Sequence, residues 1–522
     1  MADYNETELK LRFLNSCDWE RIFASPILTE QADPLSFRVE TLEAQYYDTP
    51  SHQLQKGGLA FRIRREGGVW LATIKDSGGS IAGLHQRAEW SVPVSEPKAD
   101  IAVFMDTPVG PRLAETVGEE TLIALFRTRF DRQILELHAR DGSIVELAAD
   151  RGEISFGDEQ LPILEIGLEL KSGHVGVLLQ LGADLAKEFP LLPEWRSKYF
   201  RGLQLAGLVD GDEATPPASL SFEDTEVTGT VLARILISCI QQILVAQERF
   251  LQWPEDPETL HQFRIHLRRT RSLLSFSKPR IPQETYIQFQ KILKHWGGVL
   301  APLREIDAVL ETWYEVKESG WVHFTAKPVL GDILRKKRGD LAIQIYNKLK
   351  EGQAIPELLE IWAWLLNNEL LLQAAGDEEP EIAVQPQIVD FARARLGKWV
   401  NNMIKAGNNI ETQQDEMLHK LRIRGKRLRY ALGALGLRWP KKSKKTVVCL
   451  KELQESIGYL HDTLVNHRLL QKLLQSQSSR LMYRDTGILT GWQAHKAVSV
   501  HQKIKKQWKR FLRDATIWSK KI

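Results

Sequence analysis

The sequence predicts an α+β protein in which a region of antiparallel strands is followed by a region that is almost entirely helical. Over roughly the first 200 residues, charged and apolar side chains alternate with a period of two, as they do on strands whose two faces differ. Beyond about residue 226 the apolar residues recur about every 3.6 positions, which is typical of amphipathic helices. At 522 residues, the chain exceeds what one hydrophobic core usually supports, so more than one domain is expected.

The first strand-like segment carries a charged face close to the N-terminus. On an extended strand, Glu6, Glu8 and Lys10 project together, while Leu9 and Leu11 project to the other side. Carboxylate oxygens suit Mg²⁺ or Mn²⁺, and a lysine suits the phosphoryl oxygens that such an ion bridges. Taken alone, this segment is better explained as a solvated strand face.

The same alternation returns in later strand-like segments. Residues 61–64 place two arginines on one face, residues 70–75 place Thr73 beside Lys75, residues 87–90 place Arg87 beside Glu89, and residues 145–150 and 164–169 repeat the acidic version. A solvated sheet rarely collects arginines and carboxylates on so many successive strands, so the set predicts a ligand cavity.

These segments, in this order, resemble the CYTH, or triphosphate tunnel metalloenzyme, superfamily over about residues 1–205, beginning with its ExExK signature. The matching segments are ETELK at 6–10, YYDTP at 46–50, GLAFRIRR at 58–65, GLHQRAEW at 83–90, DR at 131–132, Glu146 with DRGEI at 150–154, and SK at 197–198 with RG at 201–202. The resemblance implies an eight-stranded antiparallel barrel whose polar tunnel holds a triphosphate between basic side chains and Mg²⁺ or Mn²⁺.

Roles follow from the resemblance position by position. The implied metal ligands are Glu6, Glu8, Asp150, Glu165 and Glu169, with Glu89 and Glu146 as further candidates. The implied phosphate-binding residues are Arg62, Arg64, Lys75, Arg87, Arg132 and Lys198, and Lys10 and Glu89 are expected to act in catalysis. The chain departs from the family pattern at Gly167, where the late strand lacks its middle glutamate, which predicts weaker activity or an altered metal preference. Arg129 stands where many relatives are acidic or neutral.

Charge dictates the chemistry that such a tunnel would perform. A triphosphate repels an attacking water, so catalysis consists mostly of neutralisation and positioning. Arginine suits the non-bridging oxygens because its planar fork makes paired hydrogen bonds, whereas lysine acts as a point charge. The sequence does not select a general base.

A boundary is expected at residues 206–226, where turn formers, acidic residues and two prolines occur together. Residues 1–215 contain 22 Lys and Arg against 35 Asp and Glu, a net charge of −13, whereas the remainder contains 48 against 32, a net charge of +16. The predicted organisation is therefore a strand domain at 1–205, a linker at 206–226 and a basic helical domain at 227–522, and the basic domain favours a polyanionic partner.

The helical region contains an internal repeat. HQFR at 261–264 and HKLR at 419–422 are followed by basic residues at identical offsets, and each copy leads to a related element, LREID at 303–307 and GYLHD at 458–462. On a helix, offsets of zero, three and seven lie on one side, so each copy forms a basic stripe. One copy alone fits a solvated helix; duplication at fixed offsets favours a binding groove.

This repeat resembles the CHAD domain, a pair of related helical bundles associated with binding inorganic polyphosphate. The implied polyphosphate-binding residues are His261, Arg264, Arg268, Arg269, Arg271, His419, Arg422, Lys426, Arg427 and Arg429.

Several classes of protein are disfavoured. Three scattered cysteines without metal-ligand spacing favour reduced thiols in the cytoplasm. The N-terminus lacks the features of a signal peptide, and the apolar stretches at 231–245 and 358–372 are interrupted by polar residues, so no membrane partner is expected. No zinc-finger spacing or RNA-binding signature predicts sequence-specific nucleic-acid recognition.

The sequence thus predicts a cytoplasmic inorganic triphosphatase that hydrolyses triphosphate to diphosphate and phosphate with Mg²⁺ or Mn²⁺. Its helical domain is expected to bind polyphosphate, for example at polyphosphate granules. Two alternatives stay open: a CYTH enzyme acting on an organic triphosphate, including adenylate cyclase chemistry, and a non-catalytic polyphosphate scaffold.

Overall fold

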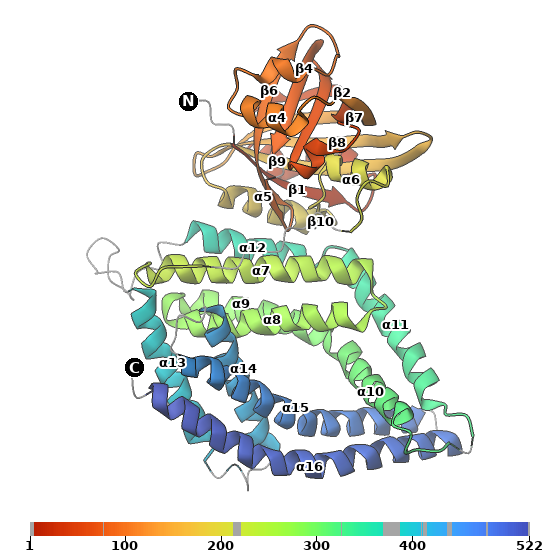
Figure 1. Ribbon diagram of the computed structural model, residues 1–522, viewed down its shortest axis with the longest axis vertical. Coiled ribbons are helices and arrows are strands. Elements are labelled where there is room, and N and C mark those ends of the chain that lie inside the picture. The colour runs from red at the N-terminus through yellow and green to blue at the C-terminus, as the bar shows by residue number, and fades with distance from the viewer. Residues whose placement is uncertain are drawn as a thin grey trace. The chain divides into compact units, whose positions relative to one another are not determined.

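The structure is a computed structural model that describes residues 5–76, 78–211, 221–324, 326–368, 387–408, 410, 415–435, 441–476 and 479–519. The chain forms two compact units (Figure 1). The first consists of residues 1–218 and 349–367, and the second of residues 219–348 and 368–522. Part of the predicted linker, residues 212–220, lies outside the described residues.

The first unit is a closed antiparallel barrel. Its eight strands are β1 (Asn5–Phe13), β2 (Arg38–Asp48), β3 (Leu59–Glu66), β4 (Val69–Asp76), β6 (Leu84–Val94), β7 (Ile123–His138), β8 (Ile144–Phe156) and β9 (Glu159–Ser172). They pair in the order β1-β9-β8-β7-β2-β3-β4-β6, and β6 pairs again with β1 to close the barrel. The short strands β5 (Gly79–Ile81) and β10 (Leu191–Pro193) extend β6 and β1. The predicted eight-stranded antiparallel barrel is confirmed.

Period-two alternation positions the side chains of β1. Leu9 and Leu11 are fully buried on one face of the strand. They pack beneath helix α5 (Gly176–Glu188), where a Cβ added at Gly182 would lie 2.5 Å from Leu9 Cδ2. The charged residues of β1 therefore point into the barrel. The charged face of β1 is therefore enclosed by the barrel and does not lie on the outer surface of the protein.

Helix α12 (Ile355–Asn367) belongs to the barrel unit although it is remote in sequence. It packs with α5, and Lys187 on α5 pairs with Glu360 on α12 at 2.5 Å. We expected all residues from 227 onward to lie in the helical domain. The 3.6-residue period predicts that α12 is a helix, but it does not specify the surface on which the helix packs.

Short helices complete the barrel unit. They are α1 (Asp18–Arg21), α2 (Pro26–Thr29), α3 (Gln53–Lys56), α4 (Gly110–Val117) and α6 (Lys198–Leu205), with 3₁₀ turns at Ile22–Ala24, Pro34–Ser36 and Ile101–Phe104. Ser197 caps α6 by accepting a hydrogen bond from Phe200 N, so Lys198 is fixed at the first helical position.

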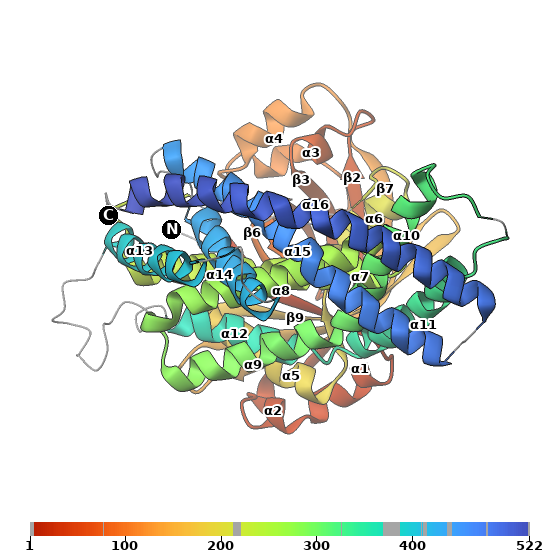
Figure 2. The same cartoon turned by 90° about the horizontal axis from the view of Figure 1, so that it is seen from below.

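The second unit is helical, as predicted. Its helices are α7 (Thr228–Gln252), α8 (Pro257–Ser277), α9 (Gln283–Val299), α10 (Ala301–Glu318), α11 (Leu330–Lys350), α13 (Ile388–Ala406), α14 (Asp415–Ala434), α15 (Lys441–Ser476) and α16 (Arg480–Ser519), with a 3₁₀ turn at Lys278–Arg280. The long helices α15 and α16 run side by side (Figures 1 and 2). The repeat helices α8 and α14 pack against each other.

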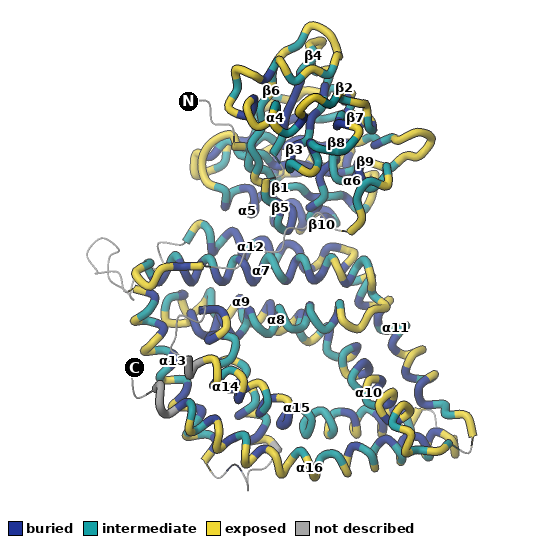
Figure 3. The backbone as a smooth tube through the Cα atoms, viewed as in Figure 1, coloured by how far each residue is buried: buried dark blue, intermediate teal, exposed yellow. Residues whose placement is uncertain are grey.

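Helix α7 is the candidate for a membrane span among the described residues. It is long and apolar enough by length and composition, with a mean hydropathy of 1.7 over an 18-residue window. However, 67% of that window is buried inside the protein, and most of α7 is coloured as buried or intermediate in Figure 3. Such burial is typical of the core helix of a helical bundle.

Candidate functional site

A cavity of about 660 Å³ lies inside the barrel. The sequence-predicted residues that line it are Glu6, Glu8, Lys10, Arg62, Arg64, Lys75, Arg87, Glu89, Arg132, Glu146, Glu169 and Lys198. They come from β1, β3, β4, β6, β7, β8, β9 and the start of α6, so barrel closure brings together residues that lie far apart in the sequence.

A row of carboxylates crosses three neighbouring strands of the cavity wall. Glu8 on β1 lies opposite Glu169 on β9, and Glu169 lies opposite Glu146 on β8. Burial and the nearby Glu6 and Glu8 raise the pKa of Glu169, although Lys171 opposes this shift from 2.8 Å. Each of the other two carboxylates also has a cation nearby: Glu8 pairs with Lys10 at 3.0 Å, and Glu146 lies 3.4 Å from Lys171. The row therefore gathers three carboxylates on adjacent strands of the cavity wall.

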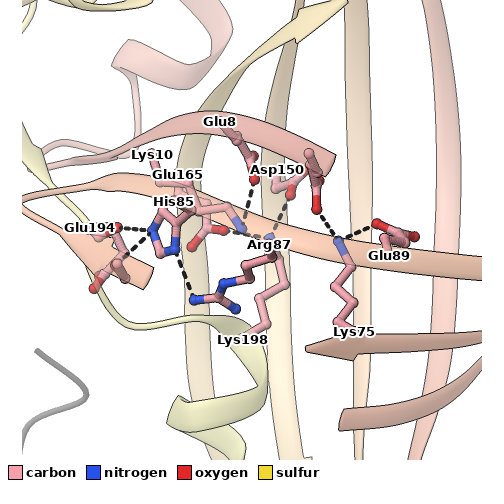
Figure 4. Close-up of polar contacts among 12 residues, drawn as sticks. Glu8, Lys10, Lys75, His85, Arg87, Glu89, Asp150, Glu165, Glu194 and Lys198 are labelled. Carbon is pink, nitrogen blue, oxygen red and sulfur yellow. Dashed lines mark hydrogen bonds and ion pairs between the residues drawn. The ribbon is translucent and has the colours of Figure 1, made fainter. Parts of the chain in front are cut away.

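A second group places a lysine between two carboxylates. The Nζ atom of Lys75 lies 2.7 Å from Glu6 Oε2 and 2.6 Å from Glu89 Oε2 (Figure 4 shows the contact with Glu89). Burial favours the neutral form of Glu6, but the charges of Lys75 and Lys10 outweigh burial and lower its pKa. The same competition between burial and the charges of Lys75 and Arg62 lowers the pKa of Glu89. Both carboxylates are thus ionised at neutral pH.

The opposite side of the cavity is strongly basic. Burial and the neighbouring charges of Arg62 and Arg132 lower the pKa of Arg64 to about 10. The Nε atoms of Arg62 and Arg64 are buried and have no hydrogen-bond partner among the described residues. Buried donors without partners are costly, so these guanidinium groups are suited to an anionic ligand that supplies acceptors.

Asp150 and Glu165, two of the predicted metal ligands, do not line the cavity. Both are 2% exposed, and their four carboxylate oxygens are engaged by cations. Arg132 contacts the two oxygens of Asp150 at 2.7 and 2.8 Å, and Lys198 contacts Asp150 at 2.7 Å and Glu165 at 2.5 Å. Arg201 pairs with the other oxygen of Glu165. In this structure, the two acids hold Arg132 and Lys198 in position instead of offering free oxygens to a metal ion.

Gly167 has a definite structural role at the position that departs from the family pattern. It lies opposite Lys10 in the β1–β9 register, and a Cβ at this position would overlap Glu8 Oε1. The glycine therefore makes room for the Glu8 carboxylate above β9. Glu8 can adopt this position only because residue 167 has no side chain.

Three residues of the site were not assigned roles from the sequence. Tyr46 on β2 lies opposite Arg62 and lines the cavity, and its ring stacks on Phe126 at a centroid distance of 4.7 Å. Arg201 is the counter-ion of Glu165. His85 is buried and contacts Arg87 (Figure 4). All three lie in segments that resemble the family, at 46–50, 83–90 and 201–202, and His85 also shares a strand face with Arg87 and Glu89.

The donor set of the cavity fits a hard divalent cation. Its carboxylates supply oxygen ligands, which Mg²⁺ and Mn²⁺ prefer, and Glu8, Glu146 and Glu169 lie on adjacent strands of the cavity wall. A separate group elsewhere in the described residues, Asp33, Glu136 and His138, places three potential ligand atoms within 4.8 Å of one another, but none of these residues lines the cavity.

In the helical unit, the two halves of the repeat face each other across α8 and α14. Burial and the charges of Arg268 and Arg422 lower the pKa of Lys426 to about 6. Burial and the charges of Arg268 and Arg304 lower the pKa of Arg264 to about 10. The helical basic cluster, as we call it, consists of His261, Arg264, Arg268, His419, Arg422 and Lys426.

Several observations mark the helical basic cluster as short of negative charge. The Nε atoms of Arg268 and Arg422 are buried and have no hydrogen-bond partner in the described part of the chain. Asp462 on α15 is a nearby acid, 3.7 Å from Arg422. His419 stacks on His461 with ring centroids 4.3 Å apart. An anionic ligand would therefore relieve repulsion among buried cations.

The other predicted residues of the repeat point elsewhere or lie at the margin. Arg269 donates to Gln242 on α7, and Arg429 donates to Gln454 on α15. Arg271 donates to Gln290 on α9, and burial together with Arg427 lowers its pKa. Arg427 itself is exposed. The offsets of zero, three and seven predict the residues that converge, whereas the remaining cations stabilise the helix packing.

Two family models match the chain. A model of the CYTH domain matches residues 5–193, and a model of the CHAD domain matches residues 234–471. The chain carries a CYTH domain followed by a CHAD domain. The N-terminal unit is thus a member of the triphosphate tunnel metalloenzyme superfamily, as its sequence motifs indicated.

The CYTH–CHAD chain is also similar to individual proteins. It is 34% identical to an inorganic triphosphatase of Haemophilus influenzae over 165 residues, which are 31% of this chain and 44% of that protein. It is 25% identical to an uncharacterized protein of Mycobacterium tuberculosis over 429 residues, 76% of each chain. The solved CHAD domain from the plant Ricinus communis is 22% identical, with 56% of this chain and 95% of that domain covered and a TM-score of 0.46.

Proposed function

We propose that the protein is a metal-dependent inorganic triphosphatase that hydrolyses triphosphate to diphosphate and phosphate. The observation that carries this proposal is the barrel cavity, in which a carboxylate row faces a set of buried cations with unpartnered guanidinium donors. A triphosphate carries several negative charges along a short chain, which matches cations spread over several strands. The similarity of the N-terminal unit to an inorganic triphosphatase supports the same substrate class.

The cavity residues divide the work between binding the substrate and holding the cofactor. Glu6, Glu8 and Glu169, with Glu146 beside them, are positioned to hold Mg²⁺ or Mn²⁺. Such an ion supplies charge neutralisation of the phosphoryl oxygens and lowers the pKa of water. Arg62, Arg64, Arg87 and Arg132 would bind non-bridging oxygens through paired hydrogen bonds, and Lys10, Lys75 and Lys198 would act as point charges.

Preorganisation is the main contribution of the protein to such a reaction. Buried ion pairs hold the side chains of Lys198 and Arg132 in place, so these cations need not change conformation when substrate binds. Fixed charges aimed at the developing negative charge lower the barrier more than mobile ones, because they need little reorganisation.

Two alternatives remain to be tested. In the first, the substrate is an organic triphosphate, which differs from inorganic triphosphate only in the group attached to the phosphates. In the second, the protein is a polyphosphate scaffold that catalyses no reaction. Phosphate release from inorganic triphosphate, ATP and long-chain polyphosphate should be compared with Mg²⁺ or Mn²⁺, for the full chain and for Glu8→Gln. We expect turnover of inorganic triphosphate to exceed the others and to fall at least about 100-fold in the variant. Preferred turnover of ATP would favour the organic alternative, and no turnover at all would favour the scaffold.

We further propose that the helical basic cluster binds inorganic polyphosphate and that the protein acts in the cytoplasm, for example at polyphosphate granules. Support comes from cations on α8 and α14 that burial and mutual repulsion destabilise. Charge reversal at Arg264 and Arg422 should weaken polyphosphate binding at least tenfold in calorimetry. Reversal of the exposed Arg424 on the same helix is the matched control, and undiminished binding after the first change would reject the assignment.

A further inference from the structure

The hydrogen bonds of His85 define its protonation state. Its Nε2 atom lies 2.9 Å from the carbonyl oxygen of Glu194, and a carbonyl can only accept, so Nε2 carries the proton. Its Nδ1 atom lies 2.9 Å from Arg87 Nη2, and a guanidinium can only donate, so Nδ1 is unprotonated. Both contacts are drawn in Figure 4. The two bonds are satisfied together only by the neutral Nε2–H form of the ring.

The partner of His85 on the far side is a rigid part of the barrel. Glu194 follows β10, and its backbone N–H donates to the carbonyl of Lys10 at 2.9 Å. The hydroxyl of Ser80 donates to the next carbonyl, that of Trp195, at 2.8 Å. The same segment then leads to Ser197 and Lys198. His85 thus connects an arginine of the cavity to a backbone segment that is bonded to β1 and continues into α6.

The groups around Arg87 restrict the conformations that its side chain can adopt. A Cβ at Gly78, whose φ is +49°, would come within 2.6 Å of Arg87 Cγ, so the stem passes over a glycine. Arg87 lines the cavity, and it lies opposite Glu6 in the β1–β6 register. The direction of the Arg87 side chain is thus set by the backbone of Gly78 next to its stem and by His85 Nδ1 next to its guanidinium.

We propose that His85 is a positioning residue, whose neutral ring holds the Arg87 guanidinium in the orientation that binds a phosphoryl oxygen in the cavity. This inference rests on the triphosphatase function proposed above. Burial and the charges of Lys10 and Arg87 hold the pKa of His85 well below its ordinary value, which keeps the acceptor nitrogen available. His85 is buried at the edge of the cavity, and both of its ring nitrogens are engaged by Glu194 and Arg87, so it acts through Arg87.

A double-mutant cycle on triphosphate hydrolysis by the full chain tests this inference. His85→Leu should lower kcat/KM about tenfold, as loss of an oriented charge-assisted hydrogen bond does, and Arg87→Met at least as much. The combination should lose little beyond Arg87→Met alone, because His85 has nothing left to orient. His85→Gln, which offers a donor and an acceptor, should recover most of the activity. His174→Leu, at an exposed histidine, is the matched control.

The outcomes separate a positioning role from a packing role. Additive losses, or equal losses for His85→Leu and His85→Gln accompanied by a lower melting temperature, would mean that His85 only fills the core. If the unmutated chain turns over no triphosphate, the proposed function fails, and the cycle is read from calorimetric binding of tripolyphosphate in the Arg264→Glu, Arg422→Glu background. Coupled losses of affinity would uphold the His85–Arg87 inference there, and independent losses would overturn it.

Discussion

At the scale of residues, the sequence predicted which side chains enter the barrel but not which of them remain available to a ligand. Alternation on a strand sets the direction of a side chain, so Glu6, Glu8 and Lys10 could be placed on one face of β1, and the charged strands that follow assigned that face to a cavity. It does not reveal cross-strand partners. Asp150 and Glu165 follow the same alternation, yet Lys198 and its neighbouring cations saturate both of them.

The Glu165 pair allows a test of burial. Arg201→Met leaves Glu165 with one cation fewer in a site that is 2% exposed, and we expect a loss of about 3–5 kcal/mol in the free energy of unfolding. The exposed pair of Arg151 and Glu20 is the control, since Arg151→Met should cost less than about 1 kcal/mol. Urea unfolding of both variants measures the difference, and equal stabilities would show that the Glu165 pair contributes no more than a surface pair.

Gly167 yields a second prediction at this scale. Gly167→Ala should displace the Glu8 carboxylate, because the new Cβ overlaps its Oε1 atom. We expect the half-saturating Mg²⁺ concentration for triphosphate hydrolysis to rise on the order of tenfold, as when groups that orient metal ligands are disturbed. Gly79→Ala, where an added Cβ meets nothing within 4 Å, should leave the metal titration unchanged. An unchanged titration in Gly167→Ala would mean that Glu8 does not hold the ion.

At the scale of elements, the repeat motif predicted two helices that each carry a basic stripe, because identical offsets place equivalent cations on equivalent faces. The packing of these two helices, α8 and α14, against each other is seen only in the structure. The individual helix lengths and the partners of Arg269 and Arg429 could not be predicted, since these depend on which helices lie behind each stripe. The helix pair creates an electrostatic property that neither helix has alone: burial, together with Arg268 on α8 and Arg422 on α14, lowers the pKa of Lys426.

This property predicts how polyphosphate binding depends on pH. Lys426 faces Arg268 on α8, Arg422 and Arg429 on its own helix, and Asp462 on α15. Its pKa of about 6 means that it is mostly neutral above that pH and charged below it, so acidification adds a cation to the cluster. Binding should tighten about fivefold between about pH 7.5 and about pH 5.5, with uptake of protons by the complex.

Calorimetry in buffers of different ionisation enthalpy measures this proton uptake directly. Lys426→Met should remove the part of the uptake that belongs to the lysine and leave the part due to the cluster histidines. Binding that weakens on acidification, or uptake that is identical in the variant, would contradict the assignment of Lys426.

At the scale of the whole molecule, composition and length predict two units. They do not predict that α12, which lies far along the sequence, belongs to the first unit. A split in net charge and a change of period locate a boundary along the chain. They carry no information about a helix that crosses back. Leu358, Leu359 and Trp362 on α12 are almost fully buried, and apart from residues 349–367 the unit to which they belong consists of residues 1–218.

The crossing predicts that the barrel is incomplete without this helix. A fragment of residues 1–218 should be insoluble or should melt at least about 10 °C below the same fragment joined by a flexible linker to residues 349–367, because several large apolar side chains lose their cover. The linked fragment with Leu359→Asp is a control that keeps the added length. Thermal unfolding and gel filtration report the outcome, and two equally stable fragments would show that α12 is dispensable.

The position of α12 in the sequence also determines when the barrel unit can be completed during synthesis on the ribosome. The last residue of the barrel unit, Asn367, is synthesised about 170 residues after the last strand ends at Pro193. At ordinary elongation rates, the nascent barrel therefore waits on the order of ten to thirty seconds with α5 uncovered. During that interval the growing chain exposes an apolar surface to which a chaperone would bind. Residues 219–348 of the second unit are also synthesised before α12 can complete the first unit.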